Sequence, residues 1–281
     1  MMNPFENIQK HEIALMAEKL TLPSDEFTFR RIFTYLDFTS LDISDTEESI
    51  GAICDKLNNF PYVFPDLPGV AAICVYPRFV KLVRERLTGK RIRIASVGGS
   101  FPSSQSFTSV KAEECRLAVE AGADEIDMVL SAGDFIAGNL TYVENEIRSI
   151  REAVGKAHLK VILETGVIDS PFLIYEASMI AMRAGADFIK TSTGKTAVSA
   201  TPEAAWVMCS AIKDFHAETG KRVGFKPAGG ISTSQKAALY YTIVENILGR
   251  EWLVPHHFRI GASRLANDLL KSIEGRTADY F

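Results

Sequence analysis

The feature that most constrains this chain is a repeat of short apolar runs rich in β-branched residues. Eight such runs end in polar residues, and longer stretches with helical spacing separate them. Alternation of this kind favours an α/β fold with a parallel sheet, and eight units suggest a closed (β/α)8 TIM barrel. The expected strands are Thr34–Phe38, Val70–Val75, Arg91–Val97, Glu125–Leu130, Leu159–Glu164, Asp187–Thr191, Arg222–Lys226 and Phe258–Gly261.

The segments between these runs complete the repeated units. In five of them apolar residues recur at three- and four-residue spacing, which predicts outer helices. No linker-like composition divides the 281 residues, and a single barrel needs about 250. We expect one barrel domain at 31–274, preceded by a short extension at 1–30 with a helix near His11–Lys19 and followed by a flexible tail at 275–281. The expected outer helices are Ser109–Ala121, Val143–Val154, Pro171–Ala184, Pro202–His216 and Ser234–Leu248.

Composition excludes several classes of function. A formal net charge of −4 provides no basic footprint for nucleic acid. No apolar run approaches the roughly 20 residues of a membrane span, and we expect no membrane association. The four cysteines are scattered without a C-x-x-C pair, which argues against a zinc site or a disulfide framework and favours a cytoplasmic setting. The five histidines lack metal-ligand spacing, so no metal site is expected.

A lysine stands at the end of the sixth expected strand, where Phe188-Ile189-Lys190 runs into a polar segment. Reacting groups of barrels lie at such strand ends. Since an isolated buried ammonium is costly, Lys190 is either a solvated rim residue or a neutral amine that attacks a carbonyl. Lys226 occupies the equivalent point of the seventh strand, and a second cation there would favour the neutral amine. We predict that the two lysines face each other.

Carboxylates also occur in the expected strands. Strand alternation puts Glu125, Asp127 and Val129 on one face, which makes Asp127 a candidate for the barrel interior. There it could balance Lys226 and move a proton during catalysis. Asp37, near the end of the first strand, is a second candidate. A lone aspartate in a strand is more often a salt-bridging residue, and this reading stays open.

Glycines follow the last two strands. Gly229-Gly230 and Gly261-Ala262-Ser263 expose backbone amides ahead of expected helices, an arrangement that binds anions without a charged side chain. Phosphate sites of barrels are frequent at these two loops. The alternative is that these glycines simply form turns.

The segments Phe188–Lys195 and Phe225–Gly230 resemble the two signature segments of the deoxyribose-phosphate aldolase family, and further matches extend over roughly 30–270. The resemblance implies a class I aldolase, a carbon–carbon lyase of deoxyribonucleotide catabolism. Its implied reaction is reversible cleavage of 2-deoxy-D-ribose 5-phosphate to D-glyceraldehyde 3-phosphate and acetaldehyde through a lysine Schiff base. It further implies small-molecule partners, no metal or organic cofactor, and a homodimer.

The resemblance also assigns roles to residues. It implies that Lys190 forms the Schiff base, that Asp127 transfers protons and that Lys226 is the cation that perturbs Lys190. Some relatives end in a tyrosine that assists proton transfer from a mobile tail, so Tyr280 is a candidate for a weaker version of that role. The implied substrate- and phosphate-binding residues are Asp37, Thr39, Thr193, Lys195, Gly229, Gly230, Gly261 and Ser263.

Two departures and two alternatives remain. The loop Gly98–Ser104 has a Gly-rich insertion, and Arg264 stands where many relatives carry a second serine. A related aldolase for another phosphorylated sugar is one alternative, which the segment from Lys226 to Gly230 argues against. The other is a non-catalytic sugar-phosphate-binding barrel. The joint presence of Lys190, Asp127 and Lys226 speaks against it, because a silent barrel needs no buried amine pair.

Overall fold

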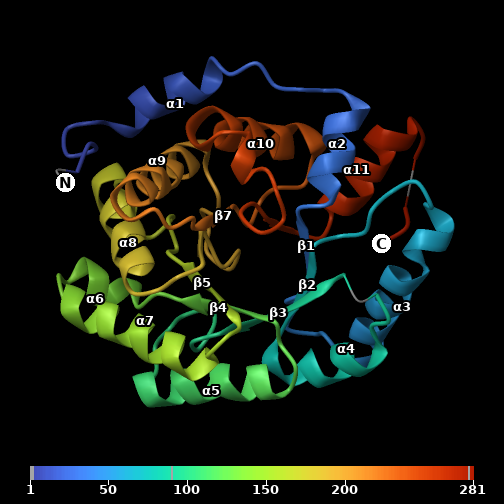
Figure 1. The fold of residues 1–281 in the computed structure, drawn as a ribbon, viewed down its shortest axis with the longest axis horizontal. Helices are drawn as coiled ribbons and strands as arrows, with labels where there is room; N and C mark the ends of the chain where they lie inside the picture. Colours follow the sequence, from blue (N-terminus) through green and yellow to red (C-terminus); the bar gives the residue numbers. More distant parts are fainter. Residues whose placement is uncertain (1–2, 90, 278) are drawn as a thin grey trace.

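Eight parallel strands form the centre of the molecule in a computed structural model that describes residues 3–89, 91–277 and 279–281 (Figure 1). Each strand is three to six residues long, and each is followed by helical structure. The expected (β/α)8 barrel is therefore confirmed. The strands are β1 Leu36–Thr39, β2 Ala72–Val75, β3 Arg93–Gly98, β4 Glu125–Val129, β5 His158–Ile162, β6 Phe188–Lys190, β7 Gly224–Lys226 and β8 Ile260–Ala262.

The barrel is nearly closed. The strands pair in parallel in the order β7-β6-β5-β4-β3-β2-β1-β8. Between β7 and β8 the pairing is reduced to two isolated bridges, Phe225 with Phe258 and Ala228 with Gly261. All eight expected strands lie within a few residues of their expected positions. The first was expected too early, because Thr34 has helical backbone angles and ends the preceding helix.

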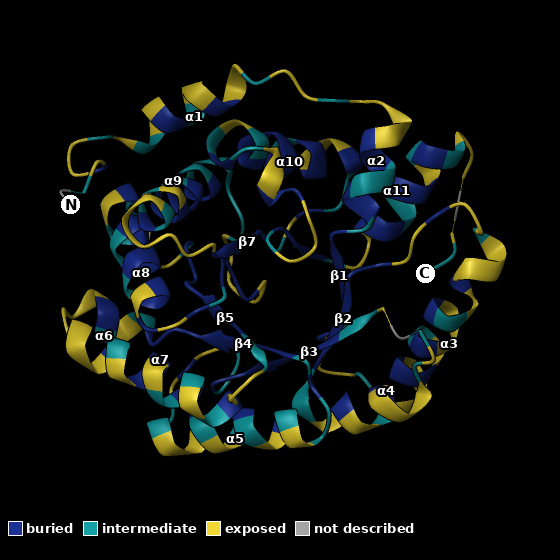
Figure 2. Ribbon diagram, in the orientation of Figure 1, coloured by how far each residue is buried: buried dark blue, intermediate teal, exposed yellow. Residues whose placement is uncertain are grey.

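Helices surround the barrel and bury their inner faces against it, while their outer faces are exposed (Figure 2). The five expected outer helices are present as α5 and α7 to α10. Others were not expected, among them α3, which begins at a capping box formed by Thr46 and Ser49. The outer helices are α3 Glu47–Val63, α4 Val80–Arg86, α5 Thr108–Glu120, α6 Ala132–Ile136, α7 Leu140–Val154, α8 Pro171–Arg183, α9 Pro202–Thr219, α10 Ser234–Leu248 and α11 Leu265–Glu274, with 3-10 turns at Pro77–Phe79 and Arg250–Trp252.

The segment before β1 contains two helices, α1 (Lys10–Glu18) and α2 (Glu26–Phe33). Helix α1 packs on α9, and Phe5 ahead of it contacts Tyr175 of α8 with ring centroids 5.8 Å apart. Helix α2 packs against α10 and α11 and leads into β1 (Figure 1). The extension thus covers the outside of the helical ring, away from the barrel interior.

The strands are packed tightly enough to require one particular glycine. A Cβ atom on Gly224 of β7 would lie 2.3 Å from the ring of Phe188 on β6. Gly224 therefore lets an aromatic side chain fill the space between neighbouring strands. None of the helices in the described residues combines the length and the apolar character that crossing a membrane requires.

Candidate active site

The interior of the barrel holds a buried network of charged side chains. Strand alternation turns these residues inward, and the network contains four basic groups and three carboxylates. All seven residues are almost completely buried. They are Asp37 of β1, Glu125 and Asp127 of β4, Lys160 of β5, Lys190 of β6, Lys226 of β7 and Arg259, which directly precedes β8.

Asp127 is the centre of this network. Its Oδ2 atom accepts hydrogen bonds from Lys190 Nζ at 2.8 Å and from Lys226 Nζ at 2.7 Å. Its Oδ1 atom accepts one from Lys160 Nζ at 2.8 Å. Burial alone would raise the pKa of Asp127, but the charges of Lys160, Lys190 and Lys226 lower that pKa well below its usual range. Asp127 is therefore an ionised carboxylate that two neighbouring amines share through one oxygen atom.

Lys226 is the predicted second cation, and the structure places it beside Lys190. The two residues are register partners on β6 and β7. Lys226 Nζ also donates a hydrogen bond to Asp37 Oδ2. Burial would lower the pKa of Lys226, but the facing carboxylates of Asp127 and Asp37 outweigh it and raise that pKa. Lys226 therefore stays charged next to the amine of Lys190.

Lys160 and Arg259 belong to the same network, although neither was identified from the sequence. Lys160 Nζ lies 2.6 Å from Glu125 Oε2. Arg259 contacts Asp37 Oδ1 at 2.6 Å and Glu125 Oε1 at 2.8 Å. Both carry a signal related to that of Lys190, because each is a basic residue that follows an apolar residue in a strand segment. Burial alone would raise the pKa of Asp37 and of Glu125. The charges of Lys160 and Arg259, together with that of Lys226 at Asp37, outweigh this effect and lower the pKa of both carboxyl groups.

A cavity of about 700 Å³ opens at the C-terminal ends of the strands, and Lys190 lies among its lining residues. Asp37 does not line it and instead lies beneath it in the charged network. Arg264 lines the cavity as well. The sequence-predicted substrate-binding residues that line it are Thr39, Thr193, Lys195, Gly229, Gly230, Gly261 and Ser263.

Two glycines shape the loops of this cavity. Gly229 has a φ of 86° and Gly230 a φ of 75°, a left-handed conformation that residues with a side chain rarely adopt. Gly261 has a different role. A Cβ atom there would lie 2.9 Å from Ala228 Cβ and 3.2 Å from Lys226 Cε. Gly261 thus leaves the space that the side chain of Lys226 occupies.

Glu164, to which the sequence assigned no role, organises the loop after β6. It follows β5 with a φ of 56°, and its carboxylate accepts hydrogen bonds from the Thr193 backbone amide at 3.3 Å, from the Thr193 hydroxyl group and from Thr196 Oγ1. Lys195 Nζ extends across the mouth of the barrel and donates to the carbonyl oxygen of Leu41 at 2.5 Å. The loop is therefore anchored on both sides of the cavity.

The last three residues contact α3, α11 and Phe38 of β1 in this structure, and the flexibility expected of the tail stays a prediction. Tyr280 Oη donates to the carbonyl oxygen of Lys56 on α3 at 2.6 Å, and Tyr280 does not line the catalytic cavity. Phe281 does line that cavity, and its ring lies 4.8 Å from that of Phe38. Asn267 of α11 accepts hydrogen bonds from the backbone amides of both tail residues. Of the two aromatic residues of the tail, Phe281 rather than Tyr280 therefore lines the cavity.

Comparison with known proteins decides the family. The family model described as DeoC/LacD family aldolase matches residues 45–251. The chain is 44% identical over 248 residues to a putative deoxyribose-phosphate aldolase of Caenorhabditis elegans, covering 87% of this chain and 81% of that protein. The chain belongs to the DeoC/LacD family of aldolases. It is also 44% identical over 263 residues to the human deoxyribose-phosphate aldolase, covering 88% of this chain and 82% of that protein.

The structural comparison agrees for the fold. A crystal structure of a putative deoxyribose-phosphate aldolase from Toxoplasma gondii superposes with a TM-score of 0.80 at 22% identity and covers 89% of this chain and 95% of that one. Membership of the DeoC/LacD family confirms the prediction of an aldolase, which is a carbon–carbon lyase. Within the described part of this aldolase, no group of three His, Cys, Asp or Glu side chains could hold a metal ion.

Proposed function

We propose that this aldolase cleaves 2-deoxy-D-ribose 5-phosphate reversibly to D-glyceraldehyde 3-phosphate and acetaldehyde through a Schiff base on Lys190. The observation that carries the proposal is that Lys190 lines the cavity and that its Nζ atom shares one oxygen atom of Asp127 with Lys226 Nζ. The names of the 44% identical relatives support the choice of substrate.

The position of Lys190 supports it as the nucleophile. Of the four basic groups in the barrel interior, Lys190 is the one that lines the cavity. A neutral amine is required for attack, because only its lone pair can add to a carbonyl carbon. The carboxylate of Asp127, in contact with Lys190 Nζ, could accept the proton that the amine must lose.

The reaction then follows from the neighbouring groups. Lys190 Nζ adds to carbon 1 of the open-chain sugar, and the carbinolamine loses water to form an iminium ion. The bond between carbons 2 and 3 breaks as the hydroxyl group on carbon 3 loses its proton. The electron pair of the broken bond between carbons 2 and 3 moves into the iminium ion, which becomes an enamine. This step releases D-glyceraldehyde 3-phosphate. Protonation of carbon 2 and hydrolysis release acetaldehyde. Asp127, in contact with Lys190 Nζ, is placed to accept and return protons at the amine, either directly or through water.

The phosphate group would bind at the rim of the cavity. The loops after β7 and β8 present backbone amides there, at Gly229-Gly230 and at Gly261-Ala262-Ser263. Lys195 adds a cation from the loop after β6. In this position the phosphate would lie at the edge of the cavity while carbon 1 reaches Lys190 at its floor.

The setting of the enzyme is part of the proposal. The four cysteines are free and buried, which supports a reducing, cytoplasmic environment. We propose a role in deoxyribonucleotide catabolism, since the substrate is the sugar phosphate that such breakdown produces, and a homodimeric assembly. Sedimentation velocity of the purified chain would test the assembly.

Borohydride trapping tests the mechanism. Wild-type protein, Lys190→Ala and the control Lys213→Ala would be incubated with 2-deoxyribose 5-phosphate and sodium borohydride and analysed by peptide mass spectrometry. We expect a reduced adduct on Lys190 in the wild type and in Lys213→Ala, and none in Lys190→Ala. Folded protein that cleaves the substrate without forming an adduct would disprove the Schiff base.

A second measurement tests the choice of substrate. Cleavage would be followed with 2-deoxyribose 5-phosphate, with unphosphorylated 2-deoxyribose and with ribose 5-phosphate under identical conditions. The proposal requires the highest kcat/KM for 2-deoxyribose 5-phosphate. An adduct on Lys190 together with a preference for another sugar phosphate would keep the mechanism and reject the substrate. Absence of both adduct and cleavage would favour a non-catalytic binding barrel.

A further inference from the structure

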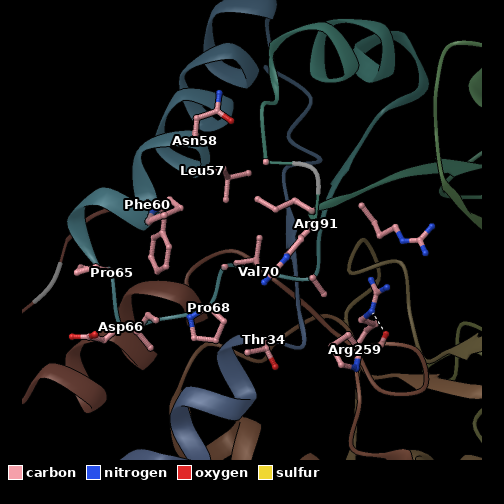
Figure 3. Close-up of a pocket in the computed structure, with 18 of the residues that line it drawn as sticks. Thr34, Leu57, Asn58, Phe60, Pro65, Asp66, Pro68, Val70, Arg91 and Arg259 are labelled. Atoms are coloured by element: carbon pink, nitrogen blue, oxygen red, sulfur yellow. Dashed lines mark hydrogen bonds between the residues drawn. The ribbon is translucent and has the colours of Figure 1, made fainter.

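A second cavity lies at the opposite end of the barrel from the catalytic one. Its volume is about 750 Å³. It is lined by residues that precede strands, including Thr34 before β1, Val70 before β2, Arg91 before β3 and Arg259 before β8 (Figure 3). Within the described residues the two cavities share no lining residue. The second cavity is therefore separate from the aldolase site.

One side of this cavity is apolar. Leu57 and Phe60 of α3 form one wall, and Figure 3 shows Arg91 across from them. Pro68 and Val70, in the segment between α3 and β2, lie near Arg91 and extend the apolar surface. An aromatic or other ring-sized group would lose its contact with water against these walls, which is favourable.

The other side is basic. Arg91, Arg93 and His256 line the cavity, and an adjoining cavity of about 430 Å³ shares all three residues. Within the described chain, neither Arg91 nor Arg93 forms an ion pair. The nearby Asp124 is already occupied, because it lies 2.8 Å from Arg84 and accepts a hydrogen bond from the backbone of β3. Two guanidinium groups therefore border the cavity, and neither is paired with a carboxylate of the described residues.

The remaining acidic residue does not change this balance. Asp66 lines the cavity, but Figure 3 shows it at the far side from Arg91, with its carboxylate directed away. Arg259 also lines the cavity, yet its charge is matched by Asp37 and Glu125 in the barrel interior. The positive charge that is available to a ligand is thus concentrated on Arg91 and Arg93.

We propose that this cavity binds an organic anion with a ring-sized apolar body and a phosphate or carboxylate group. The guanidinium groups provide the forked, charge-assisted hydrogen bonds that such anions accept. Surface arginines are commonly only solvated; here, however, the exposed Arg91 and the half-buried Arg93 border a concave apolar surface of ligand size. The assignment does not depend on the aldolase mechanism, since it uses none of the catalytic residues.

The test uses 1-naphthyl phosphate as the probe, with binding followed by its fluorescence. We expect saturable binding to the wild-type protein, with 1-naphthol and inorganic phosphate each binding at least about tenfold more weakly, because each lacks one half of the interaction. The variant Arg91→Gln/Arg93→Gln should lose affinity by about tenfold or more. The control Arg148→Gln, which removes an exposed arginine of α7 that lines neither cavity, should bind as the wild type does.

Two further measurements separate this site from the catalytic cavity and from unfolding. The variant Lys195→Gln should keep wild-type affinity for the probe, and 2-deoxyribose 5-phosphate should not displace it. The double arginine variant should keep its circular dichroism spectrum and its aldolase activity. Wild-type affinity in the double arginine variant, displacement by the sugar phosphate, or no saturable binding to folded protein would each overturn the proposal.

Discussion

The shared carboxylate of Asp127 makes a quantitative prediction about the stability of the interior. Asp127→Asn removes a charge that three lysines contact, and it raises the net charge of the ionised network by one unit. Lys160→Met removes one of those lysines and lowers the net charge by one unit. The double variant returns the network to its original net charge. The two losses of stability should therefore partly cancel.

The magnitude follows from the contacts that remain. Removal of one partner of a buried ion pair costs about 3–5 kcal/mol. In Asp127→Asn, Lys160 still contacts Glu125 and Lys226 still contacts Asp37, so we expect the lower end, about 3 kcal/mol. Lys160→Met should cost a similar amount, because Asp127 and Glu125 each keep another cation. The double variant should be more stable than the sum of the single losses implies, by about 1–3 kcal/mol.

Urea unfolding of the four proteins near neutral pH, followed by circular dichroism, measures this coupling. The matched control is the cycle of Arg183→Gln and Glu218→Gln, an exposed pair 3.4 Å apart that should show little coupling. Asp127→Asn should also lower kcat by about 10²–10⁴-fold if it transfers protons. Additive losses in the interior cycle would refute the reasoning that these charges stabilise one another.

Further predictions concern packing, pH and the cavity. Gly224→Ala should lower the free energy of unfolding by about 1–3 kcal/mol in urea titrations, because the added methyl group collides with Phe188, and an unchanged stability would contradict this. Stability should fall as the pH drops below about 4, because Asp37 and its neighbouring carboxyl groups have lowered pKa values in the folded chain and bind protons more readily when unfolded; acid titration of the unfolding free energy checks this. Lys195→Gln should raise KM for 2-deoxyribose 5-phosphate about tenfold and leave KM for unphosphorylated 2-deoxyribose unchanged in steady-state kinetics. Deletion of Phe281 should alter KM more than kcat in steady-state kinetics, because its ring lines the cavity but carries no group that can transfer a proton.

Much of the barrel could be predicted from local sequence, because each strand and most of the helices carry their own hydrophobic periodicity. Helix α3 was harder, since it contains Pro61 and its start depends on a capping box. The partners inside the barrel could not be predicted in the same way. Lys160 meets Glu125, and Arg259 meets Asp37 from more than 200 positions away in the chain, only because of strand register and closure of the barrel. Sequence shows which residues are unusual, but not which of them meet.

Register also explains why only one of the three lysines in the charged network of the barrel interior lines the cavity. Lys160 pairs with Asp127 on β4 and with Phe188 on β6, which places it two residues deeper than Lys190 along the barrel. Lys226 is the register partner of Lys190, but it is turned to Asp37 and Asp127 and does not line the catalytic cavity. Lys190 is thus the lysine of this network that borders both the carboxylate and the cavity. Lys160 and Lys226 supply the charge that surrounds Asp127, and the open end of the barrel leaves Lys190 as the amine that a carbonyl group can reach.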